Sequence, residues 1–256
     1  NYSYKPDPVF YGSGTKYLGL ELEVQAPDDA NDYDDMEAVA VELSSRYEEI
    51  YCKEDSSTGG FEIVTHPCTV DYLLDVFDWR GLTSYLLSEG YVSHSTRDGV
   101  SCGLHIHVSR KYFGEDYEIQ DGNIAKLLYL VEKFWPQMLR LSRRTPAQIE
   151  RWANRYCAED ECPDRLGPES LLARGKVWGR YYAINLENRH TIEFRLWRGS
   201  LKVNTIRATI QLVDVLTDLA VEKDVQELQA MTWPELRELL ASRGEELATY
   251  LNERGL

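Results

Sequence analysis

Three stretches of the chain alternate apolar residues with charged or imidazole-bearing residues at every second position. They are YLGLELEV (17–24), GLHIHVS (103–109) and TIEFRLWR (191–198). Because successive side chains of a β-strand point to opposite faces, each stretch predicts a strand with one apolar face and one polar face. We expect these strands to belong to one sheet. Their polar faces would carry Glu21, Glu23, His105, His107, Glu193 and Arg195.

Apolar residues at helical spacing predict helices along the rest of the chain. Asp34 or Asp35 can cap the first helix, and Thr69 can cap the second. Thr232 opens the last one, with a proline and a carboxylate at the positions that favour a helix start. The predicted spans are about 34–48, 69–89, 121–142, 145–156, 202–222 and 232–253.

The remaining segments predict strand pairs and one loop. Strand pairs are expected within 51–67 around Gly59-Gly60, within 91–110 around Asp98-Gly99, and at 176–187 and 190–199 around Asn188-Arg189. The polar stretch 158–175, which holds prolines and glycines, predicts a mobile loop. Helices interrupt strand pairs instead of alternating singly with strands, so the order favours an α+β fold around a mainly antiparallel sheet.

Length, charge and cysteine usage narrow the class of protein. The 256 residues predict one domain with a core at about 17–200 and a helical part at about 201–256. The net charge of −15 argues against a nucleic-acid partner, which clustered Lys and Arg would bind. No apolar run approaches the roughly 20 residues of a membrane span, and the N-terminus lacks a signal-peptide pattern. Five cysteines without a CxxC pair favour free thiols and a cytoplasmic location.

The polar strand faces carry the ligand types of a divalent-cation site. Glu21 and Glu23 are two residues apart, which places them about 6–7 Å apart on a strand. Mg²⁺ and Mn²⁺ prefer carboxylate oxygens, and Mn²⁺ accepts an imidazole. Two surface glutamates on an exposed strand are the alternative interpretation. Glu62 follows the turn at Gly59-Gly60 and is a weaker candidate.

The two histidines and the arginine admit more than one interpretation. His105 and His107 could be buried histidines bonded to the backbone, or ligands of a zinc hydrolase, which would need a third ligand. The other histidines offer no obvious zinc shell, so a magnesium or manganese site is favoured. Arg195 suits a phosphate clamp, and a cross-strand salt bridge on a solvated sheet is the alternative. Arg180 and Asn185 precede it in the expected strand 176–187.

Taken together, the motifs resemble those of the amidoligase family of carboxylate–amine ligases, which is related to glutamine synthetase and glutamate–cysteine ligase. The resemblance covers about 17–200 and is carried by GLELEVQ, EDSSTGGFEIVTHP, CGLHIHVS, RYYAINL and HTIEFRLWRGS. It implies a fold like the glutamine synthetase catalytic domain, with a curved, mainly antiparallel sheet and helices on its convex face. It also implies ATP and Mg²⁺ or Mn²⁺ as cofactors.

The resemblance assigns roles to individual residues. It implies that the metal ligands are Glu21, Glu23, Glu62, His105 and Glu193. It implies that the nucleotide is bound by His107, Arg195, Asn185 and Arg180, and that the catalytic residues are Arg195, Arg180 and Glu62. Either Glu54 or Asp55 could be the counterpart of the family's acidic residue in the second motif.

The expected activity is ATP-dependent formation of an amide or isopeptide bond through an acyl phosphate. The substrates would be a carboxylate and an amine on a peptide, a protein or an amino-acid-like molecule, with no nucleic acid and no membrane as partner. Two alternatives remain, namely a catalytically inactive binding module on the same scaffold and a metal-dependent hydrolase. The sequence identifies neither substrate, and it leaves the oligomeric state open.

Overall fold

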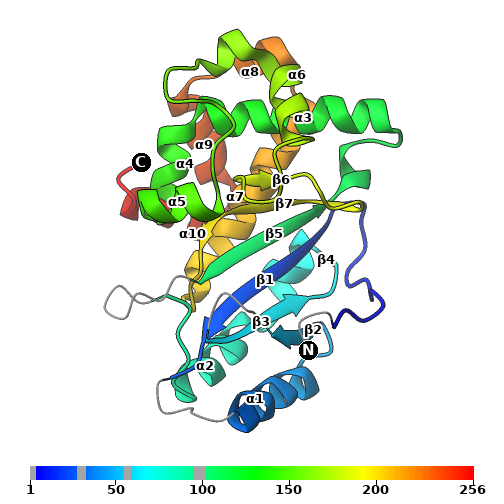
Figure 1. The fold of residues 1–256 in the computed structure, drawn as a ribbon, viewed down its shortest axis with the longest axis vertical. Helices are drawn as coiled ribbons and strands as arrows, with labels where there is room; N and C mark the ends of the chain where they lie inside the picture. Colours follow the sequence, from blue (N-terminus) through cyan, green and yellow to red (C-terminus); the bar gives the residue numbers. More distant parts are fainter. Residues whose placement is uncertain (1–3, 28–32, 55–58, 95–101) are drawn as a thin grey trace. The chain divides into compact units, whose positions relative to one another are not determined.

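The computed structural model divides the chain into two compact units (Figure 1). The N-terminal unit comprises residues 1–106 and 198–206, and the C-terminal unit comprises residues 107–197 and 207–256. The structure describes residues 4–27, 33–54, 59–94 and 102–256. The expectation of a single domain stays a prediction, because two compact units can belong to one domain or to two.

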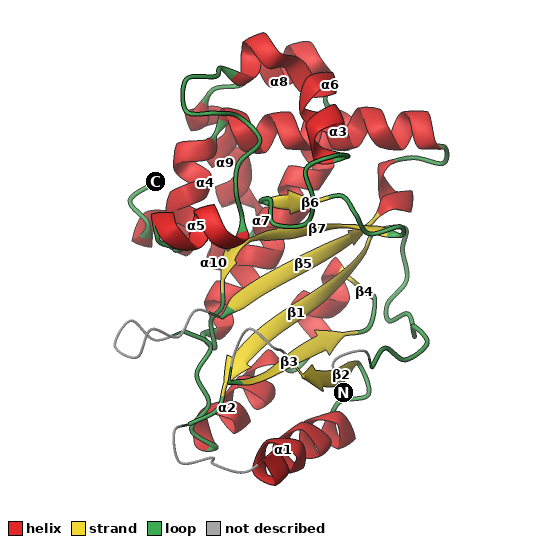
Figure 2. Cartoon of the chain, in the orientation of Figure 1, coloured by secondary structure: helices red, strands yellow, loops and turns green. Residues whose placement is uncertain are grey.

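The N-terminal unit is built on the strand order β2-β3-β1-β5, with β4 paired to β1 (Figure 2). The strands are β1 (Tyr17–Gln25), β2 (Ile50–Glu54), β3 (Gly60–Thr65), β4 (Cys68–Thr69) and β5 (Gly103–Ser109). The pairings of β1 with β3, of β1 with β4 and of β2 with β3 are antiparallel. Strand β5 contributes its first four residues to this unit and its last three to the C-terminal unit.

The apolar face of these strands forms the core of the N-terminal unit. Leu20, Leu104 and Ile106 are fully buried there. Helix α1 (Tyr33–Arg46) packs on β2 and β3. Helix α2 (Trp79–Ser88) buries Leu82 and Leu86, as expected for an amphipathic helix over a sheet. The alternate residues of each strand point to the other face of the sheet, and these include the polar side chains.

The C-terminal unit combines the strand order β5-β7-β6 with helices. Its two further strands are antiparallel and set Asn185 directly opposite Glu193. Helix α7 begins in the N-terminal unit and continues into this one. The elements are α3 (Tyr117–Lys133), α4 (Trp135–Ser142), α5 (Pro146–Trp152), α6 (Pro163–Gly175), β6 (Ile184–Asn185), β7 (Thr191–Arg198), α7 (Val203–Glu222), α8 (Val225–Ala230), α9 (Trp233–Arg243) and α10 (Glu245–Glu253).

The α+β class with a mainly antiparallel sheet is confirmed, since every pairing whose register the structure gives is antiparallel. The three alternating stretches are strands, as predicted, and so are the strands on either side of Gly59. Within the described part of the chain, no helix has the length and apolar character needed to cross a membrane. The expected turn at 98–99 lies outside the described residues.

Several predicted helices are interrupted. The span 69–89 is divided, because Thr69 belongs to β4 and Phe77 has an extended backbone. A π-helix (Tyr72–Val76) precedes this break, and Asp78 caps α2 after it by accepting the Gly81 N–H at 2.9 Å. Local apolar spacing does not reveal such breaks, because the residues on both sides still face the core.

The two longest predicted helices are also divided. The span 121–142 becomes α3 and α4 around Phe134, and Pro136 lies in the first turn of the second helix. The span 232–253 becomes α9 and α10, because Gly244 has an extended backbone. The capping box of Thr232 and Glu235 is present as predicted. Helix α8 was not predicted, and helix α1 begins at Tyr33, so that Asp34 and Asp35 lie within its first turn.

The prediction of a mobile loop at 158–175 is wrong. Residues 163–175 form α6, which packs on α3 and buries Leu171 and Gly175. The positive φ of 75° at Gly167, next to Pro168, kinks the helix. A glycine and a proline side by side are typical of a loop, which is why a loop was predicted here. The expected strand 176–187 shrinks to Ile184–Asn185. Arg180 lies in an exposed bend instead of on a strand.

Candidate metal and phosphate site

The strands of the N-terminal unit gather acidic side chains on one face. Alternation along β1 places Glu21 and Glu23 opposite the buried leucines of the same strand. The antiparallel register then sets Glu62 across from Glu23, and Lys53 across from Glu62. A row of three charged side chains therefore crosses β1, β3 and β2 on the same face.

His105 of β5 completes this group, which we call the carboxylate cluster (Glu21, Glu23, Glu62, Lys53 and His105). Lys53 Nζ lies 2.7 Å from Glu62 Oε2 and 3.7 Å from Glu21 Oε1. His105 Nδ1 lies 3.4 Å from Glu21 Oε2, and its Nε2 lies 3.6 Å from Glu23 Oε1. The imidazole thus bridges the two glutamates of β1, and the ammonium bridges two glutamates on adjacent strands.

Burial makes the excess negative charge of the carboxylate cluster costly. Burial and the nearby Glu21 carboxylate raise the pKa of Glu62 to about 7, and Lys53 offsets only part of this effect. Although burial alone would lower it, the pKa of Lys53 is raised by the carboxylates of Glu21 and Glu62. A divalent cation with oxygen ligands would relieve the repulsion, so the donor set fits Mg²⁺ or Mn²⁺.

A backbone contact fixes one of these carboxylates. The Gly103 N–H donates to Glu23 Oε2 at 2.5 Å, at the start of β5. The other oxygen of Glu23 is the one that faces His105. Glu23 is therefore oriented by two neighbouring groups on β5, and it is more than nine-tenths buried.

A second group lies in the C-terminal unit and surrounds Glu193. Arg195 Nη1 donates to Glu193 Oε1 at 2.5 Å, and Asn185 Nδ2 donates to Glu193 Oε2 at 2.7 Å. Asn188 Nδ2 also reaches that second oxygen at 3.3 Å. We call these four residues the arginine cluster. Asn185 reaches Glu193 because β6 and β7 set the two residues opposite each other. Arg195 reaches Glu193 because it lies two residues further along the same face of β7.

Arg195 keeps one donor for a ligand. It is 6% exposed, and its Nε has no hydrogen-bond partner within the described residues. Buried polar groups are normally bonded, so such an atom calls for an explanation. The carbon of its guanidinium also lies 5.8 Å from the centre of the Tyr181 ring. An acceptor such as a phosphate oxygen fits this donor.

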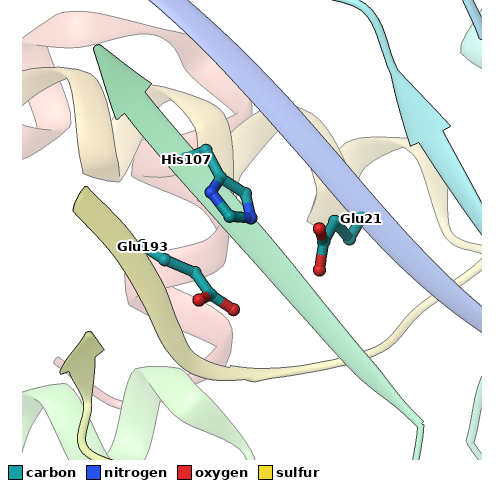
Figure 3. Close-up of side chains that lie close together, drawn as sticks. All are labelled: Glu21, His107 and Glu193. Carbon is teal, nitrogen blue, oxygen red and sulfur yellow. The ribbon is translucent and has the colours of Figure 1, made fainter. Parts of the chain in front are cut away.

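The remaining predicted residues have different surroundings. Arg180 is exposed, and its guanidinium lies 5.3 Å from the Tyr181 ring. His107 Nδ1 lies 3.1 Å from Thr191 Oγ1. His107 on β5 and Glu193 on β7 offer ligand atoms within 4.8 Å of one another, and Figure 3 draws both side chains together with Glu21 of the carboxylate cluster.

Sequence reasoning missed Lys53, Asn188 and Tyr181. Lys53 could have been found once the register of β2 and β3 was assumed, since it lies directly across from Glu62. Glu54 pairs with the buried Phe61 and therefore belongs to the opposite face of β2 from the carboxylate cluster. Asp55, the other candidate acid of the second motif, lies outside the described residues.

Comparison with solved structures shows distant likenesses. One is a bifunctional glutathione synthetase from Pasteurella multocida, with a TM-score of 0.49 and 13% identity over 94% of this chain and 46% of that one. Another is the complex of the prokaryotic ubiquitin-like protein Pup with its ligase PafA, with a TM-score of 0.41 and 10% identity over 94% and 62%. The chain thus spans about half to three-fifths of their lengths. No curated protein matches the sequence.

A family model gives the more direct result. The model described as "Putative amidoligase enzyme" matches residues 25–217, which is three-quarters of the chain. The matched range includes Glu62, both histidines of β5, and the arginine cluster. The chain therefore belongs to the amidoligase family.

Proposed function

We propose that this protein is an ATP-dependent carboxylate–amine ligase that uses Mg²⁺ or Mn²⁺. It would act on a peptide, a protein or an amino-acid-like substrate and form an amide or isopeptide bond. The observation that carries the proposal is the carboxylate cluster, in which two buried glutamates, the half-buried Glu21 and one imidazole share a sheet face in a chain of the amidoligase family.

The proposed reaction has two steps. A carboxylate oxygen of the substrate attacks the γ-phosphorus of ATP, and ADP leaves. The amine nitrogen then attacks the acyl carbon, inorganic phosphate leaves, and the nitrogen gives up a proton. A divalent cation, when bound, neutralises triphosphate charge in such reactions. Glu21, Glu23, Glu62 and His105 would hold it, because their donor atoms face one another within the N-terminal unit.

Arg195 would stabilise the phosphoryl group during its transfer. The bond to Glu193 orients its guanidinium in a buried setting, where charge–charge interactions are stronger than in water, and its Nε, which has no partner within the described residues, can donate to a phosphate oxygen. Glu193 is proposed as a further metal ligand, and the bonds from Arg195 and Asn185 orient its carboxylate. His107, Asn185 and Arg180 are proposed to bind the nucleotide, and Glu62 and Arg180 to assist catalysis.

Calorimetric titration tests the proposal. A non-hydrolysable ATP analogue is titrated with Mg²⁺ and again with EDTA into the wild type, Glu21→Gln and a control. Glu48→Gln serves as the control because Glu48 is exposed and lies outside both clusters. We expect metal-dependent binding that Glu21→Gln abolishes and Glu48→Gln keeps. The proposal would be contradicted if the wild type bound the analogue equally well in EDTA, or if the wild type did not bind it at all.

A further inference from the structure

A pocket of about 650 Å³ in the N-terminal unit is lined by residues of helices α1 and α2 and of the segments beside them. Its volume is in the range typical of small-ligand sites. It is lined by Pro27, Asp35, Ala38, Val39, Glu42, Arg46, Tyr85, Glu89 and Tyr91. None of these residues belongs to the carboxylate cluster or the arginine cluster.

The sheet separates this pocket from the carboxylate cluster. The Tyr91 ring lies 5.4 Å from the ring of Phe61. Phe61 belongs to the buried apolar face of β3, and its neighbour Glu62 points to the opposite face. The pocket is therefore on the helix-covered side of the strands, and a ligand there would be distinct from the proposed metal ion.

The pocket has an excess of negative charge. Asp35, Glu42 and Glu89 supply three carboxylates, and Arg46 supplies one guanidinium, which leaves a net charge of −2. Arg46 Nε pairs with Glu42 Oε1 at 2.7 Å, and its guanidinium lies 4.4 Å from the centre of the Tyr85 ring. The chain thus already places one organic cation between a carboxylate and an aromatic ring in this pocket.

Tyr91 adds a second, independent observation. It is 2% exposed, and its hydroxyl has no hydrogen-bond partner within the described residues. Burial and the nearby groups, among them Tyr85, Asp35 and Glu89, raise the pKa of Tyr91 to about 12, so the hydroxyl stays neutral. A buried hydroxyl that lines a pocket and lacks a partner calls for a ligand atom that can bond to it.

A metal ion does not suit this arrangement. Among the residues that the structure describes, no three ligand atoms of this pocket approach within 4.8 Å of one another. Anions are disfavoured by the net negative charge. An extended organic cation has several N–H donors and can contact carboxylates that are too far apart for one metal ion.

We propose that this pocket binds an organic cation, either a primary amine or a guanidinium. Its N–H groups would donate to Asp35 and Glu89, and one would reach the Tyr91 hydroxyl oxygen. The same chemistry is offered by a free diamine and by a lysine or arginine side chain of a peptide. The proposal needs neither ATP nor ligase activity, so it stands or falls separately from the proposed function.

Titration of the intact chain with matched probes tests the proposal. The cationic probes are 1,4-diaminobutane and the peptide acetyl-Gly-Lys-Gly-amide. The neutral controls are 1,4-butanediol and the same peptide with norleucine in place of lysine. Binding is followed by calorimetry in EDTA at low salt, because screening weakens exposed charge pairs.

Three variants locate the site. Asp35→Asn combined with Glu89→Gln should weaken binding more than about tenfold, and Tyr91→Phe should weaken it about fivefold through loss of one hydrogen bond. Glu37→Gln, on the opposite side of α1, removes one carboxylate outside the pocket and should leave binding unchanged. Thermal melting confirms that each variant is folded.

The outcomes separate the ligand sources and can overturn the proposal. Binding of the diamine alone indicates a free amine, and binding of the lysine peptide indicates a basic side chain of a partner. Failure of both cationic probes at low-millimolar concentration overturns the proposal. Equal binding of a neutral control, or unchanged binding in the Asp35→Asn/Glu89→Gln variant, overturns it as well.

Discussion

Replacing Glu62 with glutamine should change how the stability of the metal-free protein depends on pH. In the folded chain, burial and the Glu21 carboxylate raise the pKa of Glu62 from 4.5 to about 7. In the unfolded chain, the carboxyl has its ordinary pKa and ionises earlier as the pH rises. The ionised form is therefore favoured by unfolding, so the wild type loses stability from about pH 4.5 to about pH 7.

The size of this loss follows from the two pKa values. One pKa unit corresponds to about 1.4 kcal/mol, so the full loss is about 3 kcal/mol. Between pH 5.5 and 8.5, it amounts to about 2 kcal/mol. Glutamine does not titrate, so the free energy of unfolding of Glu62→Gln, relative to that of the wild type, should rise by about 2 kcal/mol from pH 5.5 to pH 8.5. Loss of the contact with Lys53 also changes the stability of the variant. Comparing the stability difference at the two pH values cancels any part of that change that does not depend on pH.

Urea denaturation in EDTA at the two pH values measures the effect. Glu48→Gln is the control, because its exposed carboxylate should give no such gain. Excess Mg²⁺ should reduce the pH dependence of the wild type, since a cation beside Glu62 favours its ionised form. An equal stability difference between variant and wild type at both pH values would refute the reasoning.

Substitutions at Glu132 and Gly60 test the packing of the chain, with Gly122 as a control. Glu132 is buried and accepts bonds from Arg155 and the Tyr156 N–H, so Glu132→Ala should cost about 3–5 kcal/mol in urea denaturation, and Glu132→Gln less. Gly60→Ala should lower the melting temperature, because a Cβ there would lie 2.0 Å from a carbonyl oxygen of β1. At Gly122 of α3 a Cβ meets nothing within 4 Å, so Gly122→Ala should not lower it.

The polar strand faces were predictable because a strand repeats every two residues. Once β1 was recognised, alternation alone placed Glu21 and Glu23 together, and the same logic paired Glu193 with Arg195. Lys53 required the pairing of β2 with β3, which is a non-local property of the sheet. The reliable part of the site was therefore the part encoded within single strands.

The helical regions show where local pattern fails. Gly167 and Pro168 suggested a loop, yet α6 continues around them because burial of Leu171 against α3 stabilises the kinked helix. Conversely, the span 121–142 looked like one helix, and its break at Phe134 leaves the apolar stripe intact. Tertiary packing decides both cases, and no sequence window of a few residues contains it.

The two clusters would accept ligands of opposite charge. The carboxylate cluster has more carboxylates than permanent cations, and the raised pKa of Glu62 expresses that imbalance. In the arginine cluster, both oxygens of Glu193 accept hydrogen bonds, and a donor, the Nε of Arg195, has no partner within the described residues. A divalent cation alone would explain only the first feature, and an anion alone only the second. Under the proposed function, a divalent cation would meet the need of the carboxylate cluster and a phosphate group that of the arginine cluster, whereas a metal-dependent hydrolase offers nothing for the second.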